Sequence, residues 1–246
     1  MKKQKPEHTL VLIKPDALKN SLTGYVLSQF SEYHAGLRFA GAKIVNVPLM
    51  LAEEHYAEHK EKPFYFSLLD FIRGFDQYPD TPAKRRVIAL VYFGDDAVQK
   101  VRNIAGPTDP HVARETRPGC VRALGSVVPI KDAEGNVVGH RMDNLIHASA
   151  TVPEAEREIK LWFKPTDIPP LMRPYKTEVA QKSFYYQDGR LFTTYKPGRT
   201  ILMAPGAIVW QSDLDVLLAL REGRRAAYSL KAVAAKYMIN EAPEED

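Results

Sequence analysis

The chain has 246 residues, of which 45% are hydrophobic and 26% charged, and its formal net charge at pH 7 is +4. This composition is typical of a folded globular protein and excludes a mainly disordered chain. No apolar run approaches the roughly 20 residues of a membrane-spanning helix, so we expect no membrane partner. The single cysteine, Cys120, excludes an internal disulfide and a zinc site built on thiolates, and it favours a cytoplasmic location.

Strand-like and helix-like patterns alternate over residues 1–165. The first strand is the apolar run Leu10-Val11-Leu12-Ile13, which is typical of a strand buried on both faces. A helical stripe follows from Leu22 to Tyr33 and ends at Gly36. Further strands are predicted at 37–47, 87–93 and 145–147, and further helices at 52–60, 63–72, 96–102 and 151–163. An α+β ferredoxin-like antiparallel sheet with helices fits this order as well as a parallel sheet does.

Two loops interrupt the alternating pattern. The segment 75–86 contains prolines and mixed charges and reads as a loop. Residues 121–130 look extended, 132–136 form a turn, and 137–142 return, which predicts a protruding hairpin. This second loop, at 131–142, comes shortly before the histidine at position 147.

The character of the chain changes after Pro165, where prolines predict a stiff linker. Residues 183–187 and 190–195 flank Asp188-Gly189, a strong hairpin signal. Residues 200–203 and 207–210 flank a proline–glycine turn and predict a second strand pair, and helices are predicted after Ser212 and from Ala226 to Met238. We therefore divide the chain into a first domain, 1–170, and a smaller β-hairpin and helix extension, 171–246.

The sequence lacks the glycine-rich phosphate loops and the common metal and hydrolase motifs. A phosphate-handling site would therefore have to use side chains. His147 ends a short apolar strand, and taken alone it is typical of an ordinary buried histidine. Together with Lys14, Arg102, Thr108 and Arg122 it would form a set of cations and neutral donors suited to a polyphosphate.

Six motifs occur in the order found in nucleoside diphosphate kinases, and the chain resembles that family over residues 7–165. The motifs are Leu12-Ile13-Lys14-Pro15-Asp16-Ala17, His55-Tyr56, Lys62-Pro63-Phe64, Gly106-Pro107-Thr108-Asp109-Pro110, Arg117-Pro118-Gly119-Cys120-Val121-Arg122 and Asn144-Leu145-Ile146-His147-Ala148-Ser149. The resemblance continues through Glu154 to Phe163, a segment that includes Glu158. The last motif alone is weak, whereas the ordered set is highly specific.

The resemblance implies a ferredoxin-like fold and a ping-pong reaction. The γ-phosphate of a nucleoside triphosphate would pass to His147 and then to a different nucleoside diphosphate. A neutral imidazole suits this role because it is a good nucleophile near pH 7. The implied cofactor is Mg²⁺, bound through the phosphates of ATP or another triphosphate with little direct protein ligation. We expect no metal ligands among the site residues.

The resemblance also implies a role for each matched residue. The nucleotide-binding set is Lys14, Tyr56, Phe64, Arg102, Thr108, Arg122 and Asn144, with Phe64 as the residue on which the base stacks. Ser149 and Glu158 would orient the imidazole of His147. Read without the motif order, Tyr56 and Phe64 are typical of core aromatics, and Glu158 of a solvated helix residue.

The chain departs from the family pattern at a few places. Position 150 is alanine where the family usually has aspartate, and we expect activity to persist because His147, Ser149 and Glu158 are kept. The two inserted loops and the extension have no counterpart in the motif set. The family's members imply a homo-oligomer built on a dimer, and the preferred nucleoside stays open. The alternative hypothesis is a non-catalytic nucleotide-binding scaffold or regulator of the same fold.

A nucleic-acid binder is a third class of function. Its basis would be the short basic runs Arg85-Arg86 and Arg224-Arg225, with Lys231. Such runs are usually solvated faces, so the sequence disfavours nucleic acid as a partner.

Overall fold

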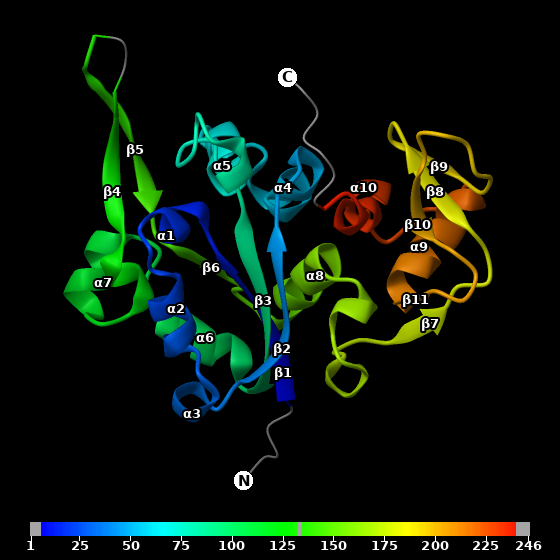
Figure 1. Cartoon of the computed structure of the whole chain (residues 1–246), viewed down its shortest axis with the longest axis horizontal. Helices are drawn as coiled ribbons and strands as arrows, with labels where there is room; N and C mark the ends of the chain where they lie inside the picture. The colour runs from blue at the N-terminus through cyan, green and yellow to red at the C-terminus, as the bar shows by residue number, and fades with distance from the viewer. Residues whose placement is uncertain (1–5, 132–133, 240–246) are drawn as a thin grey trace. The chain divides into compact units, whose positions relative to one another are not determined.

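The structure is a computed structural model that describes residues 6–131 and 134–239 (Figure 1). Asp132 and Ala133, which belong to the expected hairpin turn, lie outside the described residues. The chain forms two compact units, one comprising Met1–Ile44 and Gly74–Glu156 and the other Val45–Arg73 and Arg157–Asp246. None of the described helices combines the length and the apolar character needed to cross a bilayer.

A four-stranded sheet forms the centre of the first unit. Its strands are β1 (Pro6–Ile13), β2 (Arg38–Val45), β3 (Val87–Asp95) and β6 (Ile146–Ala148), in the order β2-β3-β1-β6. Strand β1 is antiparallel to both of its neighbours, β3 and β6. The expected antiparallel α+β sheet is therefore confirmed, and the parallel alternative is wrong.

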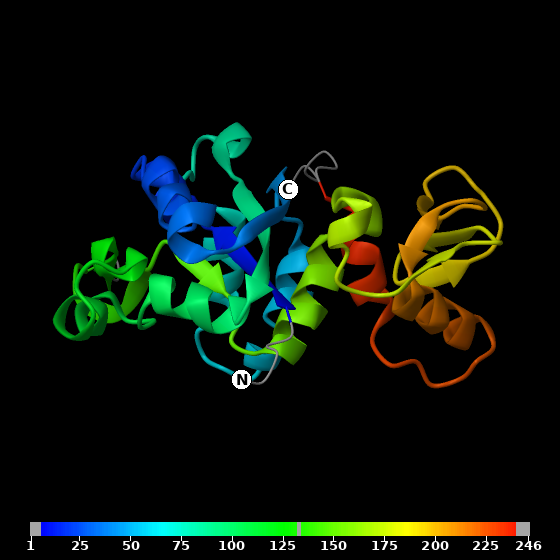
Figure 2. The same cartoon turned by 90° about the horizontal axis from the view of Figure 1, so that it is seen from below.

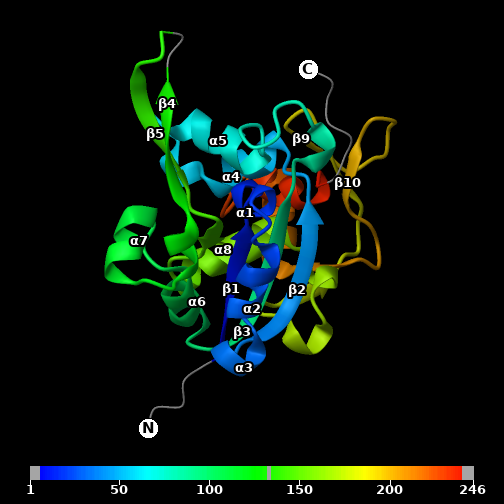
Figure 3. The same ribbon diagram turned by 60° about the vertical axis from the view of Figure 1, so that its left-hand side comes forward.

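Helices cover one face of this sheet. They are α1 (Pro15–Lys19), α2 (Thr23–Gln29), α3 (Glu32–Ala35) and α6 (Ala97–Ala105). Val11 and Ile13 of β1 share one buried cluster with Val26 and Phe30 from the α2 region and Val101 of α6. Figure 3 shows α1 and α2 lying along β1. The sheet thus has one face devoted to a helix-covered core.

The predicted hairpin is present as β4 (Ser126–Lys131) and β5 (Val137–Asp143). Among the described residues these two strands pair only with each other, and they extend as a ribbon away from the sheet (Figures 1 and 3). The expected extended start is wrong, because Val121–Leu124 forms a 3-10 helix. Before it lies α7 (Pro110–Thr116), whose first turn is capped by the Asp109 carboxylate accepting from the His111 N–H at 2.7 Å.

The second unit begins with α4 (Leu49–His55), the 3-10 turn Ala57–His59 and α5 (Tyr65–Arg73). Helix α8 (Val152–Trp162) starts in the first unit and ends in the second. Two 3-10 turns, Pro165–Asp167 and Pro170–Met172, follow it and contain the predicted proline linker.

The extension contains β7 (Thr177–Val179), β8 (Phe184–Gln187), β9 (Arg190–Phe192), β10 (Thr200–Met203) and β11 (Ile208–Trp210). The β8–β9 hairpin is confirmed. The other predicted pair is wrong, because β10 pairs with β8, and β11 pairs with β7. Ala180 explains the difference: its N–H donates to the Ala207 carbonyl and its carbonyl accepts from the Gly206 N–H, both at 2.9 Å. These bonds bind the proline–glycine turn to the end of β7.

Two helices complete the extension, α9 (Gln211–Arg221) and α10 (Leu230–Ala234), followed by the 3-10 turn Ala235–Tyr237. The predicted helix from Ala226 begins later, because the Ser229 hydroxyl caps α10 by accepting from the Ala232 N–H. Figure 2 shows α9, in orange, along one side of the yellow and gold strands. Phe184 and Leu202 of the strands share a buried cluster with Leu217 of α9 and Val233 of α10.

The extension shares its core with the segment 45–73 and the end of α8. Met50 of α4 packs against the extension's buried cluster. The Ser229 hydroxyl donates to the Glu54 carboxylate at 2.9 Å, and the Trp210 indole donates to the Phe163 carbonyl at 2.8 Å. Because of these contacts, the second unit combines sequence on both sides of residue 170.

A buried ion pair lies inside this unit. The Lys236 ammonium is 3.0 Å from an Asp213 oxygen, and both side chains are almost fully buried. The same ammonium donates to the Val233 carbonyl, and the Tyr228 hydroxyl donates to the other Asp213 oxygen at 2.7 Å. Burial lowers the pKa of Lys236, and the attraction of Asp213 opposes this shift. The ion pair is therefore needed to compensate a cation that has been removed from water.

We expect Asp213→Leu to lower the free energy of unfolding by about 3–5 kcal/mol, because it leaves Lys236 buried without a counter-charge. The double variant Asp213→Leu/Lys236→Met removes both charges and should regain at least half of that loss. Urea denaturation of the three proteins measures this difference. A double variant no more stable than Asp213→Leu would show that the uncompensated charge is not the cause.

Candidate functional site

The pairing of β1 with β6 brings together motifs that are far apart in the sequence. Leu12 lies opposite His147 in the register, and the Lys14 N–H, just after β1, donates to the Leu145 carbonyl at 2.9 Å. Residues separated by more than 130 positions therefore share one edge of the sheet.

The strand alternation determines which way His147 points. Ile146 and Ala148, its neighbours in β6, belong to the helix-covered core together with Val11 and Ile13. Successive side chains of a strand point to opposite faces, so the His147 imidazole lies on the other face, with Leu12. The residue is half-buried, whereas the residues on either side of it are buried.

Lys14, Asn144 and Thr108 form a hydrogen-bonded chain. The Lys14 ammonium donates to the Asn144 side-chain oxygen, and the Asn144 amide donates to the Thr108 carbonyl at 2.9 Å. Burial lowers the pKa of Lys14, while the nearby carboxylate of Asp16 opposes the shift and Arg122 adds to it. This series of hydrogen bonds joins three of the residues that the sequence predicted for the nucleotide site.

Asp16 was missed as a site residue, although it stands in the first motif. One of its buried oxygens accepts from the Leu145 N–H at 2.8 Å. Leu145 has a φ of 71°, in the left-handed region that a branched side chain rarely adopts. Such strain persists only where the surroundings stabilise it. Asp16 thus fixes the backbone bend between Asn144 and the strand of His147.

Arg122 connects the loop before α7 to β6. Its guanidinium donates to the Gly106 carbonyl at 2.9 Å and to the Ile146 carbonyl at 3.2 Å, and the residue is buried. It therefore brings a fixed positive charge beside the strand of His147. Arg102 is exposed on the last turn of α6. The described hydrogen bonds and ion pairs do not connect its side chain to Lys14, Asn144 or Arg122.

Ser149 is fully buried just beyond β6. Its hydroxyl oxygen accepts from the Leu10 N–H at 3.2 Å, and its own N–H donates to the Leu10 carbonyl at 3.3 Å. These two bonds fix the chain two residues after His147 against β1.

The inserted hairpin ends at the site. Arg141 of β5 makes a two-point contact with Asp143, with distances of 2.7 and 3.2 Å, and lies 3.7 Å from Asp76. Asp143 precedes Asn144, and its negative charge opposes the lowering of the Lys14 pKa by burial. The sequence showed the insertion but not this ion pair, which holds the base of the hairpin.

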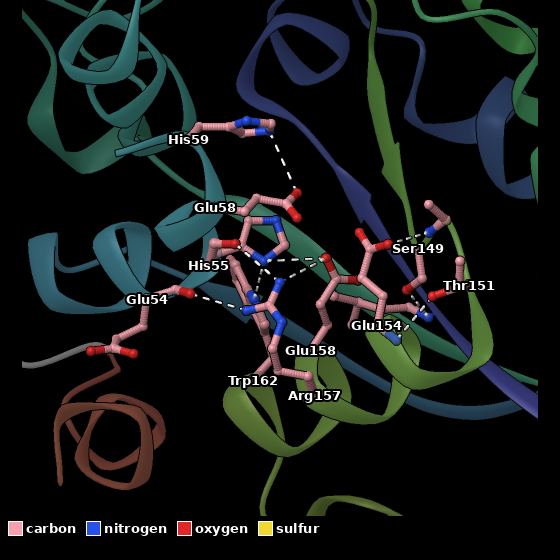
Figure 4. Close-up of polar contacts among 12 residues, drawn as sticks. Glu54, His55, Glu58, His59, Ser149, Thr151, Glu154, Arg157, Glu158 and Trp162 are labelled. Carbon is pink, nitrogen blue, oxygen red and sulfur yellow. Dashed lines mark hydrogen bonds and ion pairs between the residues drawn. The ribbon is translucent and has the colours of Figure 1, made fainter. Parts of the chain in front are cut away.

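Ala150, where the family usually has aspartate, begins a capped helix. The Thr151 hydroxyl accepts from the Glu154 N–H, and the Glu154 carboxylate accepts from the Ala150 N–H, both at 3.2 Å (Figure 4). The predicted capping arrangement at the start of α8 is thereby present, with Ala150 contributing its backbone rather than a side chain.

The remaining predicted residues belong to the second unit. Tyr56 is buried at the end of α4, with its ring 4.6 Å from that of His55. Phe64 lies just before α5 and is 53% exposed, as a stacking platform would need to be. From the sequence alone, each of these residues could be identified only as an aromatic residue at a position that matches a family motif.

Glu158 lies in a buried network on α8 (Figure 4). One of its oxygens is 3.7 Å from Nδ1 of His55, and the Trp162 indole donates to the same nitrogen at 3.2 Å. Arg157 donates to the Glu54 and His55 carbonyls at 3.1 and 3.3 Å. The interpretation of Glu158 as a solvated helix residue is wrong. Sequence reasoning noticed His55 only as part of a motif and missed its part in this network.

The first unit's arrangement is suited to an anion. Lys14 and Arg122 provide fixed positive charge, Asn144 and Thr108 are held beside them, and His147 lies on the adjoining strand. Charge-assisted donors of this kind bind phosphate oxygens strongly. One oxygen of Asp16 accepts from the Leu145 N–H, while its other oxygen is buried without a hydrogen-bond partner among the described residues, and Asp143 is paired with Arg141.

Comparison with known proteins agrees with this chemistry. A family model described as nucleoside diphosphate kinase matches residues 7–168. The nucleoside diphosphate kinase of Staphylococcus haemolyticus is 39% identical over 171 residues, which cover 70% of this chain and 97% of that protein. The Pyrococcus furiosus enzyme is 40% identical over 162 residues, or 66% of this chain and 86% of that protein.

Solved structures give the same result. A crystal structure of the Aquifex aeolicus nucleoside diphosphate kinase matches with a TM-score of 0.53 and 30% identity, covering 67% of this chain and all of that one. The Halobacterium salinarum enzyme in complex with CDP matches with a TM-score of 0.51 and 33% identity, covering 67% of this chain and 92% of that one.

The loop that carries Thr108 offers a stability test. Gly106 has a φ of 82°, and a Cβ there would overlap the Cys120 side chain; Gly119 has a φ of 93° and open space around it. Both alanine variants incur backbone strain, but only Gly106→Ala adds a clash. We expect Gly106→Ala to lower the free energy of unfolding by about 1–3 kcal/mol more than Gly119→Ala. Equal losses in urea denaturation would contradict the tight packing of this loop.

Proposed function

The chain belongs to the nucleoside diphosphate kinase family, and we propose that it carries out this family's phosphotransfer through His147. Its activity is that of a nucleoside diphosphate kinase, a phosphotransferase acting on nucleotides. The observation that carries the proposal for His147 is the β1–β6 register, which sets this residue on the strand next to Lys14.

The reaction has two balanced halves. In the first, a neutral imidazole nitrogen of His147 attacks the γ-phosphorus of a nucleoside triphosphate. An N–P bond forms, the bond from phosphorus to the bridging oxygen breaks, and the nucleoside diphosphate leaves with that electron pair. In the second half, a terminal phosphate oxygen of another nucleoside diphosphate attacks the phosphorus. An O–P bond forms, the N–P bond breaks, and its electron pair returns to the imidazole nitrogen of His147. Splitting the transfer allows one nucleotide site to serve both halves.

Lys14 and Arg122 are proposed to offset the charge on the transferring phosphoryl group. Little covalent chemistry is required of a protein in such a transfer, so positioning and electrostatic stabilisation dominate. Asn144 would bind the ribose and Thr108 a phosphate, both already connected to Lys14. Arg102, exposed on α6, would turn toward the phosphates when nucleotide binds.

The base is proposed to stack on Phe64, with Tyr56 nearby in the same segment. The exposed ring of Phe64 supports this role. Every base has a π-face, so stacking with few base-edge hydrogen bonds would accept different nucleosides.

Ser149 and Glu158 are proposed to orient the imidazole of His147. The support is that each is already held in place within its own unit, Ser149 by the backbone of Leu10 and Glu158 by His55 and Arg157. A preorganised partner loses little freedom when it holds the reacting ring.

Mg²⁺ is proposed as the cofactor, bound to the nucleotide phosphates. When bound, it would neutralise part of the phosphate charge. We further propose a homo-oligomer built on a dimer and a cytoplasmic location, the latter supported by the single cysteine. We also propose that residues 1–170 form the kinase domain and residues 171–246 an extension, to which the sequence assigns no role.

Incubation of the chain with γ-labelled ATP and Mg²⁺ should give a phosphoprotein that is labile in acid and stable in base. His147→Ala should abolish the label and the exchange of phosphate between GTP and ADP. His140→Ala, on the exposed hairpin, is the control and should retain both. Persistent acid-labile labelling of His147→Ala would place the nucleophile elsewhere.

The stacking role of Phe64 predicts a binding defect. Phe64→Ala should raise the KM for ATP, GTP and CTP by a similar factor of about 5 to 100, because a stacked base contributes about 1–3 kcal/mol. The maximal rate should change much less. Phe66→Ala is a matched control, since Phe66 is a neighbouring aromatic that is 76% exposed. The role of Phe64 would be rejected by an unchanged KM.

A further inference from the structure

The three-stranded sheet of the extension has a second face, turned away from its core, that the proposed kinase reaction does not use. Its strands have the order β10-β8-β9, and Phe184 and Tyr186 of β8 point into the core shared with α9. By alternation, Tyr185 points the other way, opposite Phe192 of β9 and Ile201 of β10 in the register. We call the outward side chains of Tyr185, Phe192 and Ile201, with those of the following loop 193–199, the aromatic face.

Arg199 fixes the loop 193–199 over this face. Its guanidinium lies 3.5 Å from the centre of the Phe192 ring and donates to the Thr194 carbonyl at 2.7 Å. Its Nε donates to the Gln187 side chain at 3.3 Å. The Tyr195 ring, which follows Thr194, lies 6.0 Å from that of Tyr185 and is 68% exposed. The exposed ring is thus held in place before any partner arrives, which reduces the entropy lost on binding.

The charged residues in the sequence around the aromatic face are almost all positive. Residues 180–208 contain four cations, Lys182, Arg190, Lys196 and Arg199, and one acid, Asp188 in the hairpin turn. Lys182, Arg190 and Lys196 are exposed. Arg190 stands on β9 opposite Gln187, two residues before Phe192 on the same face. One exposed ring, that of Tyr195, and the half-buried ring of Tyr185 are therefore accompanied by exposed cations.

We propose that this aromatic face binds single-stranded nucleic acid. Bases would stack on Tyr195 and Tyr185, and the phosphates would contact Lys182, Arg190 and Lys196. Proteins that bind single strands without sequence preference combine aromatic platforms with a positive groove in this way. The short basic runs considered from the sequence, Arg85-Arg86 and Arg224-Arg225, take no part.

The charge argues against an apolar protein partner. The fully buried core of a stable interface between proteins is depleted in charged residues, with lysine among the most depleted. Here exposed lysines and an exposed arginine accompany the rings, with few apolar neighbours beyond Ile201. Single-stranded nucleic acid is a polyanion whose unpaired bases have flat apolar faces. It therefore matches both the cations and the aromatic rings of this face.

The test is fluorescence anisotropy with the full-length chain and labelled oligothymidylate and oligouridylate of about 12 nucleotides, within the range of one such site. Saturating ADP keeps the oligonucleotide out of the kinase site. We expect binding at low salt that weakens as salt is added, and weaker binding of a duplex of equal length. Tyr195→Ala should weaken binding about 5- to 100-fold, and Lys196→Glu should lower the salt slope by about one.

The matched control is Arg225→Glu, which makes the same charge change at an exposed position between α9 and α10. It should alter affinity by less than about twofold, and all three variants should retain phosphate exchange between GTP and ADP. Absence of oligonucleotide binding at low salt would overturn the proposal, as would an equal loss in Arg225→Glu. An oligomer that dissociates in Tyr195→Ala, without oligonucleotide binding, would assign the face to contacts between copies.

Discussion

The antiparallel pairing of β1 with β6 is the constraint on which the candidate site depends. It fixes His147 opposite Leu12 and brings Leu145 to the backbone of Lys14. A shift of one residue in this register would turn His147 into the helix-covered core and bring both Ile146 and Ala148 out of it. The cost of burying an imidazole there, and of exposing two core residues, makes the observed register strongly favoured.

The pairing works because several polar bonds fix the chain on each side of the short strand. Before it, Asp16 stabilises the left-handed backbone of Leu145, and Asn144 bridges Lys14 to Thr108. After it, Ser149 is bonded twice to Leu10. A strand of three residues would be too short to hold the side chain of His147, the proposed nucleophile, by itself. The surrounding bonds, buried where water does not compete, provide the rigidity.

The extension is part of the structure around the predicted base-binding segment rather than a loosely attached tail. Its core includes Met50 of α4, and its Ser229 bonds to Glu54. Tyr56 follows α4 directly, and a Glu158 oxygen lies 3.7 Å from Nδ1 of His55 at the end of α4. The same unit that presents the aromatic face therefore also contains Tyr56 and Phe64, the aromatic residues proposed at the base of the nucleotide. The two proposed functions draw on separate side chains of this unit.

The sequence by itself determined the elements that local pattern controls. The apolar run of β1, the glycine end after α3, the Asp188-Gly189 hairpin and the cap of α8 all follow from residues close together in the chain. It also supplied the ordered motifs, and with them the family and the candidate residues. Their physical basis is local: side-chain periodicity and turn conformation need only a few neighbouring residues.

Only the tertiary structure decided which strands pair and which polar groups meet. The β7–β11 and β8–β10 pairings, the bond of Asp16 to Leu145, the Arg141–Asp143 contact at the base of the hairpin and the burial of Glu158 beside His55 depend on partners chosen by packing. The sequence of one segment does not show which distant residues will contact it. The interaction energy of such contacts arises only when distant segments fold together and bury a shared surface. For that reason His147 and Lys14 could be predicted as site residues from the sequence, whereas the β1–β6 register that brings them together was decided only by the tertiary structure.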